Sequence, residues 1–208
     1  DSDRLKSGYR KIIKMSMLLS SSGCLAMAAM AKPLIVILIG EKWIMCSEYL
    51  QIICFGALLY PVHAINLNVL TVMGRSDLFL KLEIIKKIVC FFPIIVGVFL
   101  GIKLMLLAGV LSGFISFAIN AYYSKDLINY SFIQQFRDIL PYIVVAVFVG
   151  SIAWTITLFP INIFLQFFLQ VILFLFLIIT YYEYKKQSEY IELKKIFLSL
   201  IKNIISRV

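Results

Sequence analysis

Long apolar stretches and short polar segments alternate along the whole chain. Six stretches are long enough to cross the hydrocarbon core of a membrane, which takes about 20 helical residues. They cover residues 12–39, 46–73, 84–101, 104–123, 140–159 and 163–182. Spanning segments are either helices or strands of a closed barrel, and these are too long and too uniformly apolar for barrel strands. The pattern predicts an all-α, polytopic transmembrane helix bundle with about six spanning helices.

Basic residues are concentrated in every second gap between these stretches. Of the 20 Lys and Arg residues, 17 lie in residues 1–14, 73–87, 124–138 and 183–208. The other gaps hold only Lys32, Lys42 and Lys103. Because loops rich in Lys and Arg stay on the cytoplasmic side, we expect both ends of the chain to be cytoplasmic. An even number of crossings agrees with this orientation.

The composition excludes a soluble domain. Mean hydropathy is +0.98, and only 15% of the residues are charged, whereas soluble domains have about 25%. The net charge of +9 is carried by short loops beside apolar stretches. This arrangement favours anionic membrane lipid over nucleic acid as the partner. The four cysteines have no metal-binding spacing, so we expect neither a disulfide nor a metal site.

The first apolar stretch contains a lysine followed by a proline, which helix geometry explains. Lys14 and Lys32 are 18 residues apart, which corresponds to about 27 Å of helix and matches the hydrocarbon thickness. Lys14 and Lys32 are therefore expected at the inner and outer boundaries. Pro33 permits a kink, and Gly40 is the expected end of the helix.

Two other segments have the composition of helices that lie in the inner headgroup plane. Residues 125–139 mix charged residues with large apolar ones. Residues 183–208 are predicted to form a cytoplasmic amphipathic tail, and a solvated tail is the alternative. One helical face of the tail holds its apolar residues, namely Leu193, Phe197, Leu200, Ile201, Ile204 and Val208.

No set of residues typical of an enzyme is present. The chain has one histidine, no pair of carboxylates within an apolar stretch and no glycine-rich phosphate loop. Acid–base and nucleophilic catalysis need such groups, so we expect neither enzyme activity nor a cofactor. Glu83 lies four residues before Lys87 and is predicted to pair with it on a helix surface.

Polar residues within the apolar stretches are the better candidates for function, since they are costly in lipid and usually face a cavity or a partner. His63 and Asn66, three residues apart within residues 46–73 and expected close to mid-membrane, are the main candidates. The weaker candidates are Tyr60, Asn120, Gln166 and Gln170. For each of these, a hydrogen bond between helices is the alternative interpretation.

Several short motifs, in order and spacing, resemble the C-terminal part of Wzx-type lipopolysaccharide O-antigen flippases. These belong to the polysaccharide transporter family of the multidrug/oligosaccharidyl-lipid/polysaccharide flippase superfamily. The likeness covers most of residues 4–142 and weakens over the last two helices and the tail. The motifs are Pro33-Leu34-Ile35, Gly40-Glu41-Lys42-Trp43, Asn66-Leu67-Asn68-Val69-Leu70, Gly74-Arg75-Ser76-Asp77-Leu78-Phe79-Leu80-Lys81, Asn129-Tyr130-Ser131 and Asp138-Ile139-Leu140-Pro141.

The resemblance implies a C-terminal lobe, residues 1–182, of a flippase with 12–14 helices, whose N-terminal lobe is absent from this chain and would be its partner. It implies that undecaprenyl-diphosphate-linked oligosaccharide is moved across the bacterial inner membrane by alternating access. His63 and Asn66 would then line the cavity, and Arg75 at its cytoplasmic mouth would meet the diphosphate. Such cavities are often basic, but no basic residue is expected at mid-membrane here. The alternatives are a cation-coupled multidrug exporter and a membrane glycosyltransferase or polysaccharide polymerase.

Overall fold

The chain folds into an all-α bundle, which confirms the predicted fold class. The computed structural model describes residues 2–205, with side chains left undescribed at residues 2, 3, 124, 126, 127 and 201–205. This part of the chain contains no strand. Its long helices are α1 (Ser2–Ala29), α3 (Cys46–Ala57), α4 (Tyr60–Val72), α5 (Ser76–Leu100), α6 (Ile102–Ile128), α7 (Phe132–Trp154), α8 (Ile163–Lys185) and α9 (Ser188–Ile205).

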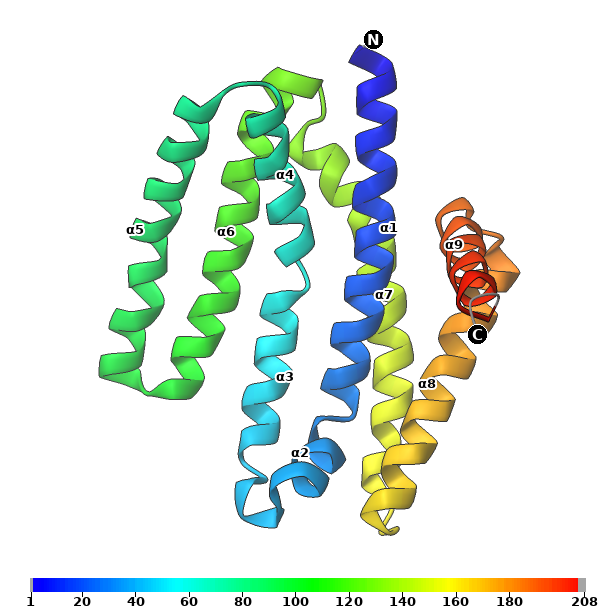
Figure 1. The fold of residues 1–208 in the computed structure, drawn as a ribbon. Coiled ribbons are helices and arrows are strands. Elements are labelled where there is room, and N and C mark those ends of the chain that lie inside the picture. Colours follow the sequence, from blue (N-terminus) through cyan, green and yellow to red (C-terminus); the bar gives the residue numbers. More distant parts are fainter. Residues whose placement is uncertain (1, 206–208) are drawn as a thin grey trace.

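Helix α1 is the centre of the packing. It lies beside α7 along most of its length and also contacts α3, α4 and α8 (Figure 1). Ile13 and Met17 on α1 and Ala146 and Ala153 on α7 are fully buried. Helices α5 and α6 form an antiparallel hairpin on one side of this centre, and α8 packs against α7 on the other.

Five segments of the described chain are long and apolar enough to cross a membrane. They are Arg4–Ala29, Cys46–Val72, Ile102–Tyr123, Phe132–Leu158 and Ile163–Lys185. The sixth predicted span, residues 84–101, corresponds to the later part of α5 and its C-cap, Gly101. Helix α5 is as long as the others, but Glu83, Lys86 and Lys87 place three charges beside its apolar half. Most of the basic gap predicted at residues 73–87 is therefore part of a helix, which begins at Ser76.

Two predicted helices are broken where proline comes close. Residues 12–39 form α1 and the short α2 (Ala31–Ile39), with the break at Met30, three residues before Pro33. Residues 46–73 are divided into α3 and α4 at Leu58 and Leu59, just before Pro61. Gly40, at a φ of 95° that favours glycine, ends α2 as predicted. It leads into a short 3₁₀ helix, η1 (Glu41–Trp43).

The prediction of an interfacial helix over residues 125–139 is wrong. Helix α6 continues to Ile128, and the chain turns at Asn129, whose φ of 49° is left-handed. The Ser131 hydroxyl accepts a hydrogen bond from the backbone N–H of Gln134 and caps α7. A local cap therefore divides this segment between two long helices.

Candidate functional site

Ionic and polar side chains from three helices meet at one end of the bundle. Asp138 of α7 accepts two hydrogen bonds from the Arg10 guanidinium of α1, at 2.7 and 2.9 Å. It also accepts one from the Tyr130 hydroxyl at 2.6 Å. The Lys14 ammonium lies 3.7 Å from the same carboxylate. Because the Asp138 side chain is only 9% exposed, these three donors replace the water that its charge has lost.

The same network continues to α4 through amide groups. Asn66 accepts a hydrogen bond from the Tyr9 hydroxyl and donates one to Gln135 at 3.1 Å. Gln135 in turn donates to the backbone carbonyl of Tyr130 at 3.3 Å. We refer to Tyr9, Arg10, Lys14, Asn66, Tyr130, Gln135 and Asp138 as the Asp138 network. The network joins α1, α4 and α7. Asn66 therefore makes hydrogen bonds between helices, which was the alternative to a role in a substrate path.

Tyr130 takes part in this network as a neutral donor. Burial, together with its hydrogen bond to the Asp138 carboxylate, raises the pKa of Tyr130. The ring also meets Tyr9 edge to face, with centroids 5.9 Å apart. The Arg10 guanidinium lies 5.7 Å from the centre of the Tyr130 ring. Tyr130 therefore contacts both members of the ion pair, Asp138 through its hydroxyl and Arg10 through its ring.

The contacts of α1 show how far His63 and Asn66 lie from the charged end of the bundle. Lys14 is the last charged residue of α1 before a run without charge that reaches Lys32. Asn66 accepts a hydrogen bond from Tyr9. Tyr9 precedes Lys14 by five residues and so lies in the charged part of α1. Ser20, within the apolar run, donates to the carbonyl of Leu58. His63 lies between Leu58 and Asn66 on the chain, so its level is close to that of Lys14. Relative to α1, both side chains therefore lie nearer its charged end than the middle of its apolar run.

A second cluster lies between α4, α5 and α6. The His63 ring nitrogen Nδ1 and the Asn120 amide nitrogen are 3.2 Å apart, and the His63 ring meets Phe117 edge to face. Lys86 of α5 bonds to Glu83, which replaces the predicted pairing of Glu83 with Lys87. Helices α4, α5 and α6 pack against one another, so both side-chain pairs lie in the same part of the bundle. We call His63, Glu83, Lys86 and Asn120 the Lys86 cluster.

The sequence pattern does not identify Lys86 as a candidate, because Lys86 falls in the basic gap 73–87 between two apolar stretches. Its side chain is 14% exposed, whereas the neighbouring Lys87 is exposed. Lys86 lies ten residues into α5, which places it about 15 Å along the helix from Ser76. In the sequence, the distance of Lys86 from the turn at Gly74 is the feature that indicates a position well inside the helix.

The other candidates are separated from these two groups. Tyr60 is exposed. Arg75 is exposed and bonds to Asp77 at 3.1 Å, which lowers the pKa of Asp77. Gln166 donates to the carbonyl of Ile156 at 3.2 Å, and it lines a cavity of about 800 Å³ together with Lys32 and Glu41. Gln170 is fully buried, and neither polar atom of its side chain has a hydrogen-bond partner.

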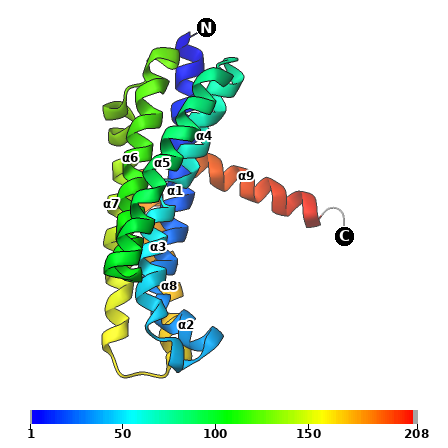
Figure 2. The same ribbon diagram turned by 90° about the vertical axis from the view of Figure 1, so that its left-hand side faces the viewer.

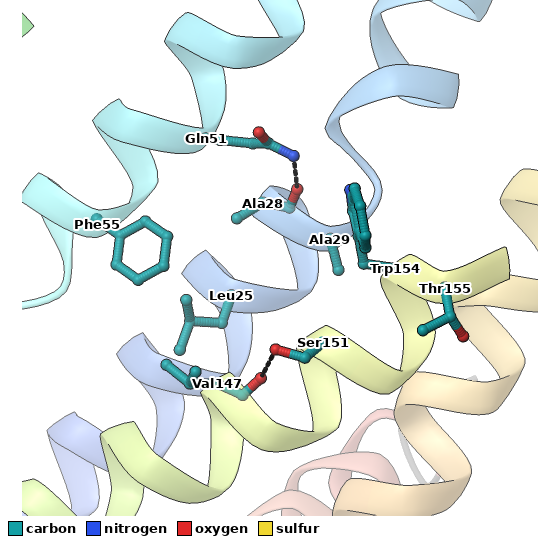
Figure 3. A pocket seen from close by; sticks show the side chains of 10 residues that line it. Leu25, Ala28, Ala29, Gln51, Phe55, Val147, Ser151, Trp154 and Thr155 are labelled. Atoms are coloured by element: carbon teal, nitrogen blue, oxygen red, sulfur yellow. Dashed lines mark hydrogen bonds between the residues drawn. The ribbon is translucent and has the colours of Figure 1, made fainter. Parts of the chain in front are cut away.

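An apolar groove of about 500 Å³ lies between α1, α3 and α7, far from the Asp138 network (Figure 3). The three polar side chains that line it are bonded to backbone carbonyls: Gln51 to Ala28, Ser151 to Val147 and Thr155 to Ile152. Its other side chains include Leu25 and Phe55. The groove therefore suits a hydrocarbon chain better than a polar ligand.

No group of three or more His, Cys, Asp or Glu side chains capable of holding a metal ion occurs among the described residues.

The chain has no significant match among protein-family models, curated proteins or solved structures.

Proposed function

We propose that this chain is part of a bacterial inner-membrane flippase for an undecaprenyl-diphosphate-linked oligosaccharide, such as an O-antigen or capsule repeat unit. The observation that carries the proposal is the Lys86 cluster. The Lys86 side chain is only 14% exposed, and it pairs with the partly exposed Glu83. A charge that is largely removed from water is costly unless it has a partner, so a recessed lysine is a candidate for substrate binding. A lysine ammonium is also a suitable partner for a diphosphate.

Two further observations support the proposal. The turn that resembles the flippase motif, Gly74 to Lys81, leads directly into the part of α5 that carries Lys86. The apolar groove at the other end of α1 provides space for part of a polyprenyl chain. Alternating access would use the two ends in turn, with the diphosphate loaded at the Lys86 cluster. His63 and Asn120 would then contact the substrate beside Lys86.

Genetic complementation tests this proposal. Cells that lack the natural polypeptide containing this chain are expected to lose surface polysaccharide and to accumulate lipid-linked oligosaccharide in the inner leaflet. Reintroducing the protein should restore both to normal. Unchanged surface polysaccharide in the deleted strain would exclude this function, and a lower tolerance of drugs would instead support the multidrug exporter alternative.

The proposed orientation places the Asp138 network and the Lys86 cluster on the cytoplasmic side, because most basic residues belong to that end of the helices. In a variant without the four native cysteines, a cysteine at the exposed position 42, in η1, is then expected to react with an impermeant reagent in intact cells. A cysteine at position 76 is expected to react only after the cells are opened. The reverse pattern of labelling would invert the orientation.

A further inference from the structure

Helix α9 joins the bundle at the level where three apolar segments end. Helix α1 has no charge between Lys14 and Lys32, α7 has none after Asp138, and α8 has none before Glu183. Lys14 connects these boundaries to α9, since its ammonium lies 3.7 Å from Asp138 and 3.6 Å from Glu189. The start of α9 therefore lies in the plane where the bundle changes from apolar to charged.

The direction of α9 is across the bundle instead of along it. Lys186, with a left-handed φ of 46°, ends α8, and α9 begins two residues later. Figure 2 shows α9 projecting sideways from the bundle at this level. An ion pair of 2.6 Å between Lys11 and Glu192 holds its first half against α1. The second half extends beyond the other helices.

The apolar face of α9 turns toward the apolar side of this plane. Tyr190 stacks on Tyr182, in the last turns of α8, with ring centroids 5.8 Å apart. Leu193 packs against the same core. Phe197 and Leu200 follow on this face at helical spacing, but they are 65% and 53% exposed. The apolar face of α9 thus continues beyond the bundle, at the level where the uncharged segments of α1, α7 and α8 begin.

We infer that α9 lies in the headgroup region of the adjacent leaflet, with Phe197 and Leu200 among the acyl chains and lysines on anionic phospholipid headgroups. Charge favours lipid over a second protein as the occupant of this face. Glu189 and Glu192 are neutralised by lysines of α1, while Lys185, Lys186 and Lys195 are exposed. An apolar face with flanking lysines is typical of helices that bind anionic membranes. The inference does not depend on the transport proposal.

The depth of labelled side chains in lipid vesicles tests this inference. The complete chain, with its four native cysteines replaced by alanine, receives a nitroxide label at Phe197→Cys and is reconstituted into vesicles of phosphatidylcholine and phosphatidylglycerol. The label at 197 is expected to collide severalfold more often with oxygen, which concentrates in the acyl chains, than with a water-soluble nickel chelate. A label at Ser199→Cys, on the opposite face, should show the reverse.

Each remaining outcome is decisive. A label at 197 that is protected from both oxygen and nickel would mean that α9 packs against protein, and one that is open to nickel would mean a solvated tail; either overturns the inference. Replacing Lys185, Lys186 and Lys195 with glutamine should reduce the ratio of immersed to water-exposed label by about fivefold per lysine. Equal immersion in vesicles of phosphatidylcholine alone would overturn the requirement for anionic lipid.

Discussion

Replacing Lys86 with glutamine is expected to reduce export of surface polysaccharide by at least about tenfold. The proposed substrate is a diphosphate, and a hydrogen bond to a charged group contributes about 1.5–3 kcal/mol, of which 1.4 kcal/mol already corresponds to a factor of ten. The measurement is surface polysaccharide in cells that carry the variant as their only copy of the protein. The amount of protein in the membrane is measured in parallel.

Two controls separate a contact with the substrate from a contribution to folding. Lys87→Gln removes the same charge from the neighbouring, exposed position and should leave export close to normal. In the double variant Glu83→Gln, Lys86→Gln, both members of the part-buried pair are neutral, so no unpaired charge remains. Export should still be lost in the double variant. Restored export would show that the Lys86–Glu83 pair has only a structural role.

Replacing Asp138 with asparagine is expected to lower the free energy of unfolding by about 2 kcal/mol, since Arg10, Lys14 and Tyr130 all lose a charged acceptor. The value lies below the range of about 3–5 kcal/mol for fully buried ion pairs, because the Arg10 side chain is partly exposed and remains hydrated. For a chain of this size, that loss corresponds to a decrease in Tm of about 4–8 °C. Thermal unfolding in detergent provides the measurement.

Asp77→Asn is the matched control for Asp138→Asn. Asp77 also pairs with an arginine, Arg75, but the pair is exposed, so the unfolding free energy should stay unchanged within the error of the measurement. A double variant that also carries Arg10→Gln tests whether the two residues act together. If the effects of Arg10→Gln and Asp138→Asn simply add, the Arg10–Asp138 pair does not stabilise the bundle.

The sequence by itself determined the all-α architecture and the approximate position of every long helix. Apolar stretches of about 20 residues have few other stable conformations in lipid, so this inference needed no tertiary contact. The breaks near Pro33 and before Pro61 and the helix end at Gly40 also follow from local backbone chemistry. The amphipathic pattern of the tail likewise predicted a helix, which is present as α9.

Only the tertiary structure decided which polar residues meet and at what level. Asn66 lies in the second half of the apolar stretch 46–73, and from the sequence it is expected close to mid-membrane. Its bond to Tyr9 sets it at the charged end of α1 instead, because α3 and α4 together are longer than the apolar run beside them. Periodicity similarly gave no reason to join Arg10 with Asp138, which are 128 residues apart. Packing also determines how exposed a lysine side chain is. Lys86 and Lys87 are adjacent in sequence, but the packing of α5 leaves Lys86 largely covered and Lys87 exposed.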